Sequence, residues 1–320
     1  MANRSDTGSN RLDDAARAGW LYYVAGNTQD EIARKLGVSR QSAQRLVSLA
    51  VSERLIKVRV DHPIANCLDL AARLKAQFDL IECEVVPSDP DAPNSAAGLA
   101  QAGAVALERY LSAKEPRIIA LGTGRALRAS VEQLSALKCP HHRIVSLLGN
   151  MMPDGSATAY NVVIRLADRV GARHYPMPLP VLARSVEERD VLHNQEAVRN
   201  ILAHCREADV TFVGIGGTGS EAPLVLDGVL TRAEMSEMIK AGAVGEITSW
   251  IFDKAGQVIA HPVNDRVASA PLVVASERPV VGIAAGKNKV AAIRAALSGR
   301  LINALITNEL TAEALLGNPR

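Results

Sequence analysis

Three polar side chains within five residues have the chemistry needed to recognise DNA bases. Arg40, Gln41 and Gln44 lie at the start of a helical segment, away from the side that carries its apolar residues. An arginine can donate two hydrogen bonds to guanine O6 and N7, and a glutamine can pair similarly with adenine N6 and N7. Arg45 is better placed for a phosphate, whose contact fixes register. These residue types predict a DNA-reading helix.

The elements that would position this helix form a helix-turn-helix. Thr28 and Glu31 make the T-x-x-E capping box of a first short helix, and Gly37 allows the turn. Ser39 is the expected N-cap of the reading helix, and Thr28 and Ser39 are counted among the DNA-contacting residues. Residues 55–60, LIKVRV, alternate like the strand of a wing. The alternative is a three-helix packing motif whose polar edge faces only solvent.

Three domains are expected along the chain. Residues 12–62 are assigned to a winged helix-turn-helix, 63–79 to a linker helix, and 80–320 to an effector-binding and oligomerisation domain. The first of these begins with a helix over 12–25 that carries Ala16, Trp20 and Val24 on one apolar stripe.

Charge is concentrated at the N-terminus. The first 62 residues hold ten Lys or Arg against seven Asp or Glu, a surplus larger than the net charge of +2 of the whole 320-residue chain. Any basic surface for nucleic acid is therefore expected in this segment.

Beyond residue 80, short apolar strands alternate with helices. Hydrophobic residues are 48% of the chain and aromatic residues only 3%, so the core must consist mainly of Ala, Val, Leu and Ile. This composition and order predict an α/β fold with a mainly parallel sheet, whose ligand sites lie outside the carboxyl ends of the strands. One of the expected strands covers residues 247–252.

Two glycine-rich turns follow predicted strands. The first, Gly122 to Arg125, runs into a helix and collects free amides, the Thr123 hydroxyl and a guanidinium, which would suit an anion or a polyol. Its alternative is a tight turn in which glycine only relieves strain. The second, Gly214 to Gly219, matches G-x-G-x-x-G, but a Pro-containing segment follows in place of a helix. A loop closing over a ligand is the better interpretation there.

Other functional classes find little support. The four cysteines are far apart, without a C-x-x-C pair, so reduced thiols in a cytoplasmic protein are expected and no metal site. Neither an export signal nor a run of about 18 apolar residues occurs, so no membrane partner is expected. No catalytic residues are assigned, because neither a G-x-S-x-G elbow nor a Walker A sequence is present. A cofactor is not expected either.

Motifs in order from about Ala15 to Leu316 resemble the SorC family of sugar-binding transcriptional regulators. In the N-terminal part they are Thr28 to Ala33 and Leu36 to Arg40. In the larger part they include Gly122 to Arg125, Asn161, Gly214 to Gly216, Gly242 to Gly245, Asp253 to Gly256, Asn264 to Arg266, Gly286 to Lys289, and Leu305 to Asn308.

The resemblance implies a regulator of a carbohydrate or polyol catabolic operon that binds operator DNA, usually as a homotetramer. Its larger domain would be similar in fold to ribose-5-phosphate isomerase, glucosamine-6-phosphate deaminase and the CoA transferases, and would bind a sugar, polyol or sugar phosphate. Carried over by position, the effector site would comprise Gly122, Thr123, Gly124, Arg125, Asn161, Asp253, Asn264, Arg266 and Lys289.

Departures from the family pattern bear on the effector. Ala126 stands where many relatives have Thr, and the missing hydroxyl beside the anion cradle favours a neutral polyol or free sugar as an alternative to a phosphorylated one.

Two other functions stay open on sequence alone. One is an isomerase- or deaminase-like enzyme fused to a DNA-binding domain, and the other is a nicotinamide-dependent redox sensor based on Gly214 to Gly219.

Overall fold

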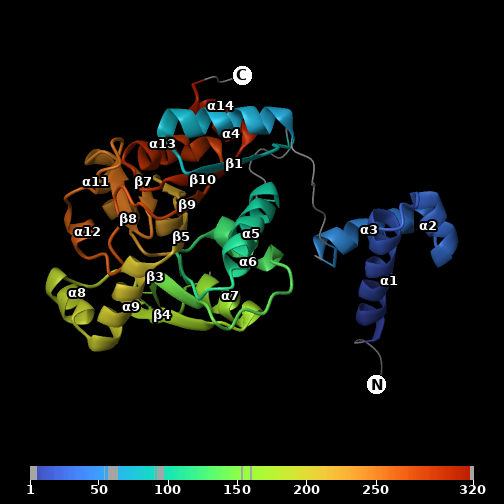
Figure 1. Ribbon diagram of the computed structural model, residues 1–320, viewed down its shortest axis with the longest axis horizontal. Coiled ribbons are helices and arrows are strands. Elements are labelled where there is room, and N and C mark those ends of the chain that lie inside the picture. Colours follow the sequence, from blue (N-terminus) through green and yellow to red (C-terminus); the bar gives the residue numbers. More distant parts are fainter. Residues whose placement is uncertain are drawn as a thin grey trace. The chain divides into compact units, whose positions relative to one another are not determined.

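The computed structural model describes residues 6–53, 55–56, 64–89, 91, 97–152, 154–158 and 161–317. The chain divides into two compact units, residues 1–62 and 63–320 (Figure 1). Each unit has its own hydrophobic core, so each is described separately.

The first unit contains the predicted helix-turn-helix. Its helices are α1 (Asp6–Tyr23), α2 (Gln29–Leu36) and α3 (Arg40–Ser52). The capping box of α2 is complete, since the Thr28 hydroxyl accepts from the Glu31 amide and the Glu31 carboxylate accepts from the Thr28 amide. Gly37 ends α2 at a φ of 66°, and the Ser39 hydroxyl caps α3. Local sequence therefore fixes both helix starts and the turn between them.

Helix α1 packs on its partners through a different side from the stripe seen in the sequence. Ala15 and Ala18 are fully buried, whereas Trp20 is 55% exposed and Val24 66% exposed. A Cβ atom at Gly19 would lie 2.2 Å from Ile56 Cδ1, so the small residues of α1 allow it to pack closely against the segment around Ile56. The expected wing falls largely on residues 57–60, which lie outside the described residues.

The second unit is built on a seven-stranded sheet in which every neighbouring pair is parallel, as predicted. In spatial order the strands are β1 (Glu82–Val86), β10 (Ala304–Asn308), β9 (Val280–Ile283), β5 (Val210–Gly214), β2 (Ile118–Leu121), β3 (Arg143–Met151) and β4 (Arg173–Pro180). From β2 the chain adds β3 and β4 toward one edge of the sheet, and from β5 it adds β9 and β10 toward the other edge. The order of the strands therefore reverses between β2 and β5. This is the topological switch point, where open α/β sheets bind ligands.

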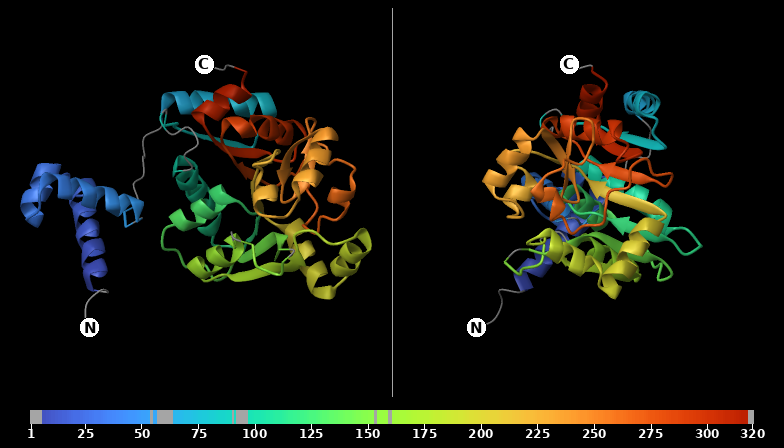
Figure 2. Two further views of the ribbon diagram at one scale, coloured as in Figure 1. Left: turned by 180° about the vertical axis from the view of Figure 1, so that it is seen from behind. Right: turned by 90° about the vertical axis from the view of Figure 1, so that its left-hand side faces the viewer.

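Helices cover both faces of this sheet (Figures 1 and 2). One face packs on α5 (Ala97–Leu111), α6 (Arg125–Gln133) and α7 (Val162–Val170). The other packs on α4 (Ala65–Phe78), α9 (Glu196–Glu207), α13 (Val290–Ser298) and α14 (Glu309–Leu315). Buried side chains are almost all aliphatic, as the composition requires, and Phe212 is a fully buried exception in β5.

Helix α4, expected as a linker, is an integral part of the second unit. Leu70 and Leu74 are buried in the same core cluster as Leu315 of α14. The two helices lie side by side in both views although they come from opposite ends of the unit (Figure 2). Burial of these leucines makes the helix a structural element of the sheet's cover rather than a spacer.

A small antiparallel sheet is inserted between β5 and β9. It contains β6 (Gly216–Gly217), β7 (Ala243–Ile247) and β8 (Trp250–Asp253), with α10 (Pro223–Leu226), α11 (Arg232–Lys240) and α12 (Pro262–Asp265) in the same insertion. The single strand predicted for 247–252 is wrong, because Thr248 and Ser249 form a hairpin turn with φ of 49° and 71°. Both φ values are left-handed, and neither residue is the glycine or asparagine that announces such a turn.

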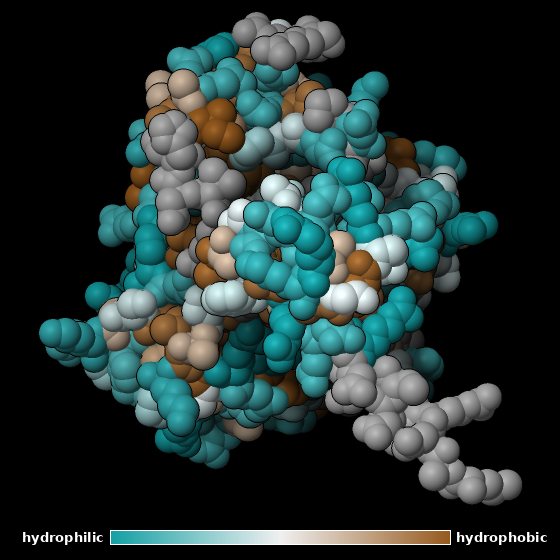
Figure 3. Space-filling view, turned by 90° about the vertical axis from the view of Figure 1, so that its right-hand side faces the viewer, coloured by the Kyte–Doolittle hydropathy of each residue, from teal (hydrophilic) through white to brown (hydrophobic). Residues whose placement is uncertain are grey.

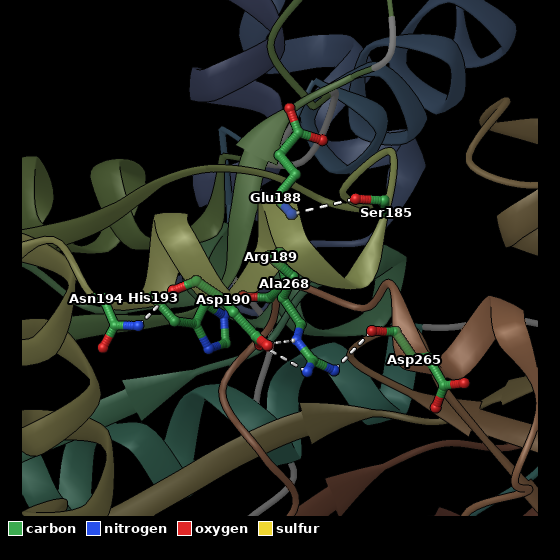
Figure 4. A network of polar contacts seen from close by, with 8 residues as sticks. All are labelled: Ser185, Glu188, Arg189, Asp190, His193, Asn194, Asp265 and Ala268. Atoms are coloured by element: carbon green, nitrogen blue, oxygen red, sulfur yellow. Dashed lines mark hydrogen bonds and ion pairs between the residues drawn. The ribbon is translucent and has the colours of Figure 1, made fainter.

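Helix α8 (Val186–His193) ties this insertion to the main sheet (Figure 4). The Arg189 guanidinium donates to the Asp265 carbonyl at 2.6 Å, and His193 Nε2 lies 2.9 Å from the Ala268 carbonyl. A β-bridge between Leu182 and Val267 joins the same two segments. Side chain and backbone contacts thus hold α8 and the segment before it against the end of α12 and the segment that follows.

The face in Figure 3 is mainly hydrophilic, with hydrophobic residues in small separate groups. Within the described ranges, no helix combines the length and apolar character needed to cross a bilayer.

Candidate functional site

A cavity of about 260 Å³ opens at the switch point of the sheet. It lies at the carboxyl ends of β2, β5 and β9. The small antiparallel sheet, α10, the end of β3 with residues 152 and 156–158, and Val181 after β4 also line it. Its polar side chains are Thr123, Arg125, Ser156, Thr158, Asp227, Glu246, Ser249 and Lys289, and its apolar ones include Leu148, Val181, Ile215, Leu224 and Ile283. A mixed, concave site of this size suits a small ligand with both C–H and hydroxyl groups.

The turn from β2 into α6 forms one wall. Gly124 has a φ of 130° and precedes α6, so the first amides of that helix have no partner within the helix. The end of β5 lies against this turn, because a Cβ atom at Gly214 would be 2.7 Å from the Thr123 carbonyl oxygen. The two glycine-rich segments predicted from sequence therefore meet at one cavity, one of them at a helix N-terminus that favours electronegative atoms.

Two opposite charges, Glu246 and Lys289, line the same cavity and are partly buried. Burial raises the pKa of Glu246, and the Asp227 carboxylate adds to this, while the Ser249 amide and the Lys289 ammonium oppose it. Burial lowers the pKa of Lys289, with Arg125 acting in the same direction and Glu246 opposing. Each charge thus partly stabilises the other where water is scarce.

Glu246 is held in place by its own hairpin. Its Oε2 accepts from the Ser249 amide at 2.9 Å, across the turn between β7 and β8. Gly216 on β6 provides the space, since a Cβ there would lie 2.1 Å from Glu246 Oε1. Sequence reasoning missed this residue. The available signal was a carboxylate inside the short strand AVGEI, directly after the family motif that ends at Gly245.

A second, smaller hollow of about 30 Å³ adjoins the cavity. Gly122 and Asn161 line it, and Thr123 and Thr158 border both spaces. Asn161 has left-handed backbone with a φ of 37° at the start of α7. Six of the nine residues carried over by resemblance therefore border these two adjoining spaces; they are Gly122, Thr123, Gly124, Arg125, Asn161 and Lys289.

The other three carried-over residues have partners within the fold and do not line the cavity. The Asp253 carboxylate accepts from the amides of Ala255 and Gln257 at 2.9 Å each, which closes the turn after β8. Asn264 is 2% exposed and bonds to the backbone of Ile251 and Ile259. Arg266 donates to Glu234 at 2.7 Å. Their geometry is that of residues that stabilise the small sheet and α12.

The run from Gly214 to Gly219 does not form a dinucleotide fingerprint. Such a fingerprint needs a helix that begins within the glycine run, with its N-terminus at the pyrophosphate. Here Gly216 and Gly217 form strand β6, which pairs with β7, and the next helix starts only at Pro223. The segment serves as cavity wall and sheet edge.

The proposed base-reading side chains lie together on the solvent side of α3. Arg40, Gln41, Gln44 and Arg45 are exposed, while Ala43, Val47 and Ala50 on the other side are buried. Arg40 forms an ion pair with Asp30 at 3.5 Å, but both side chains are more than 60% exposed. An exposed pair of this kind is weak and leaves the guanidinium available to DNA.

A helix-turn-helix unit joined to an α/β unit with a ligand cavity defines a ligand-controlled DNA-binding protein. The sugar-binding domain family model ("Sugar-bind") matches residues 62–317. The chain belongs to the SorC family of sugar-binding transcriptional regulators.

Individual relatives agree with this assignment. The erythritol catabolism regulatory protein EryD of Brucella abortus is 35% identical over 95% of this chain and 96% of its own length. The transcriptional regulator LsrR of Escherichia coli K12 is 31% identical over 98% and 97%. The full-length sorbitol operon regulator SorC of Klebsiella pneumoniae superposes with a TM-score of 0.69 at 26% identity, covering 96% of this chain and 99% of that one. These relatives support a regulator rather than the enzyme alternative.

Replacing Asn264 tests its structural role. Asn264→Ala removes the side-chain partner of the Ile251 amide and of the Ile259 carbonyl, at about 1 to 3 kcal/mol for a buried group left unpaired, while the Ile251 carbonyl keeps its bond from the Ile259 amide. We expect a clear loss in the free energy of unfolding measured by urea denaturation. Asn194→Ala, which removes an exposed side chain bond to Asp190, is the control and should change little. Equal stability of the two variants would contradict this role.

Proposed function

We propose that the chain controls a carbohydrate or polyol catabolic operon by binding a small neutral polyol or free sugar in the cavity at the switch point. The observation that carries this proposal is the charge balance of the lining, where Arg125 and Lys289 stand against Asp227 and Glu246. A doubly charged phosphate would need a surplus of cations, whereas a neutral polyol does not.

The polar groups match the chemistry of hydroxyls. Glu246 accepts hydrogen bonds, Lys289 and the amides at the start of α6 donate them, and Thr123 and Ser249 can do either. Ala126 lines the cavity at the position where many relatives have Thr, which removes one donor from a phosphate site. Apolar side chains on the remaining walls can contact the carbon chain of a polyol.

The relatives bear on size and setting. EryD is named for erythritol catabolism and SorC for the sorbitol operon, so polyols of four to six carbons are the first candidates here. As the family resemblance implies, the protein acts in the cytoplasm, as a homotetramer, on double-stranded operator DNA. An effector controls such a protein by binding two conformations with different affinity, and only that difference shifts DNA binding.

A thermal-shift screen tests the effector class. A ligand present at about 100 times its Kd stabilises the folded state by about 2.7 kcal/mol. We expect shifts with one or more four- to six-carbon polyols or free sugars, and smaller or absent shifts with their phosphates. Lys289→Met should remove the shift, while Lys254→Met, outside the cavity lining, should keep it. A shift confined to phosphorylated ligands would overturn the neutral effector.

The pH dependence of effector binding should report on Glu246. Its pKa is raised above the ordinary value of 4.5, so the accepting carboxylate is lost as pH falls through that raised value. We therefore expect affinity to decrease on acidification from neutral pH, and Glu246→Gln to bind more weakly at neutral pH with a flatter profile. Isothermal titration from pH 5 to 8 measures both. An unchanged slope in the variant would exclude Glu246 as the titrating group.

Substitution of Arg40 tests base reading. Arg40→Ala should cost about 1 to 3 kcal/mol for each guanine it contacts and relax preference at that position. Gel-shift titration on duplexes obtained by in vitro selection, with single-base variants, measures this. Arg73→Ala on α4 is the control for loss of an exposed arginine. Unaltered base preference in Arg40→Ala would remove it from the reading set.

A further inference from the structure

A second cavity lies on one face of the main sheet, away from the switch point. On this face α4, α13 and α14 pack around one core cluster and α9 packs around another. The cavity has a volume of about 190 Å³ and takes its walls from both clusters, with Leu202 from the second and Val213, Val280 and Leu301 from the first. This lateral cavity therefore lies at the junction of two separate cores.

One wall of the lateral cavity is the irregular segment 270–273. It is held at its ends, where the Ala270 amide donates to the Leu147 carbonyl at 2.7 Å and the Ala275 amide donates to the Arg300 carbonyl at 2.9 Å. Between these two bonds the amides of residues 272–274 donate to no backbone carbonyl in the described part of the chain. A segment with so few hydrogen bonds opens at low cost, so this wall can move to admit a ligand.

The lining is apolar inside and positive at its exposed end. Large aliphatic side chains come from the sheet and the helices around it; they are Leu147, Leu202, Val213, Ile247, Val280 and Leu301. Burial raises the pKa of the Cys205 thiol to about 12, so this lining residue is neutral. Arg206 is exposed and is the one charged side chain in the described lining. The cavity at the switch point differs, because its charges balance.

Size and charge together define the class of ligand. Apolar protein cavities of about 150 Å³ bind molecules as small as benzene, so a volume of about 190 Å³ holds a chain of about six to eight carbons. No carboxylate of the described residues lies within 4 Å of the Arg206 guanidinium. An arginine at the exposed end of an apolar space matches a ligand that ends in a carboxylate.

The two cavities share a turn of the chain. Thr248 lines the lateral cavity, and the next residue, Ser249, lines the cavity at the switch point. Both have left-handed backbone, which persists in residues other than glycine only where the surroundings hold it. Thr248 also contacts the other wall of the switch point, since its Cγ2 lies 3.1 Å from the place of a Cβ atom at Gly122. A ligand against Thr248 therefore lies beside the residue whose amide holds Glu246.

Thr248 also carries unused hydrogen-bonding capacity. The residue is 4% exposed, and its hydroxyl oxygen has no hydrogen-bond partner among the described residues. A buried hydroxyl without a partner is unfavourable. The wall that Thr248 forms is thus the one where a rearrangement on ligand binding meets the least resistance.

We propose that the lateral cavity is a second ligand site, which takes a monocarboxylate with an apolar chain of about six to eight carbons. The chain lies along the aliphatic walls, and the carboxylate pairs with Arg206. The ligand contacts Thr248 in the turn that holds Glu246. This site is separate from the cavity of the proposed function.

Octanoate is the probe for the first test, in the full-length protein. Trp250 Nε1 donates to the Ala270 carbonyl at 3.0 Å, so its emission reports on one wall of the lateral cavity. Trp20→Phe removes the only other tryptophan of the chain. We expect a saturable change in emission with octanoate, and the same Kd by isothermal titration of the unmodified chain. Absence of saturable binding in the titration would overturn the proposal.

A filling variant locates the bound octanoate. Thr211 lines the lateral cavity from β5, on the same side of the strand as Val213, so Thr211→Phe places a ring where the chain would lie. We expect this variant to lose octanoate binding and Val191→Phe, at a 67% exposed position on α8, to keep it. Circular dichroism checks that both remain folded.

Lys289→Met distinguishes the two cavities. Octanoate bound to the cations at the switch point would depend on Lys289, whereas octanoate in the lateral cavity would not. We expect Lys289→Met to bind octanoate as the unmodified chain does. Loss of binding in this variant, or its retention in a folded Thr211→Phe protein, would overturn the proposal.

Arg206→Ala tests the charged end of the ligand even if Thr211→Phe does not fold. Octanoate affinity should fall about two- to fivefold, as for an exposed ion pair, while the affinity for neutral 1-octanol stays the same. Arg199→Ala, exposed on the same helix, removes the same charge and should change neither. Equal octanoate affinity in the two variants would overturn the monocarboxylate assignment. None of these measurements uses a polyol, so failure of the effector screen would not affect them.

Discussion

The electrostatic balance between Glu246 and Lys289 is the constraint on which the ligand site depends. A buried charge is costly unless it is paired or hydrogen-bonded. Here the carboxylate has one amide donor, from Ser249, and the field of Lys289. Among the described residues, the Lys289 ammonium has no carboxylate within 4 Å. The polar groups of the cavity therefore remain available for hydrogen bonds with ligand hydroxyls.

Several otherwise unrelated features of the fold follow from this pair. The side chain of Glu246 needs a glycine opposite it on β6, and its hydrogen bond closes a turn with two consecutive left-handed residues, Thr248 and Ser249. Lys289 lines the same space from the short turn between β9 and α13. The main sheet supplies the cation and the small sheet supplies the anion. A ligand that bonds to both must therefore favour one spacing of the two sheets over others.

Much of the architecture could be predicted from sequence because its causes are local. The capping box at Thr28 and the turn at Gly37 determine the helix-turn-helix within a dozen residues. Alternating apolar strands and helices predicted the parallel sheet, and the two glycine-rich turns lie at the end of the sheet where the cavity opens. The hairpin at 248–249 was mistaken for strand because its left-handed turn lacks glycine and is closed by a hydrogen bond from the Ser249 amide to the Glu246 side chain.

Motif membership and periodicity each identify a residue without its surroundings. Asp253 and Asn264 belong to family motifs, yet both side chains form their hydrogen bonds with backbone groups in and around the small sheet. A recurring polar residue can therefore position a site without touching its ligand. The apolar stripe of α1 shows a different point, since its Trp20 and Val24 are exposed and an apolar stripe need not face the core of its own unit. Small residues on the neighbouring side of α1 allow close packing there, and the large apolar residues of the helix lie on the surface of the unit.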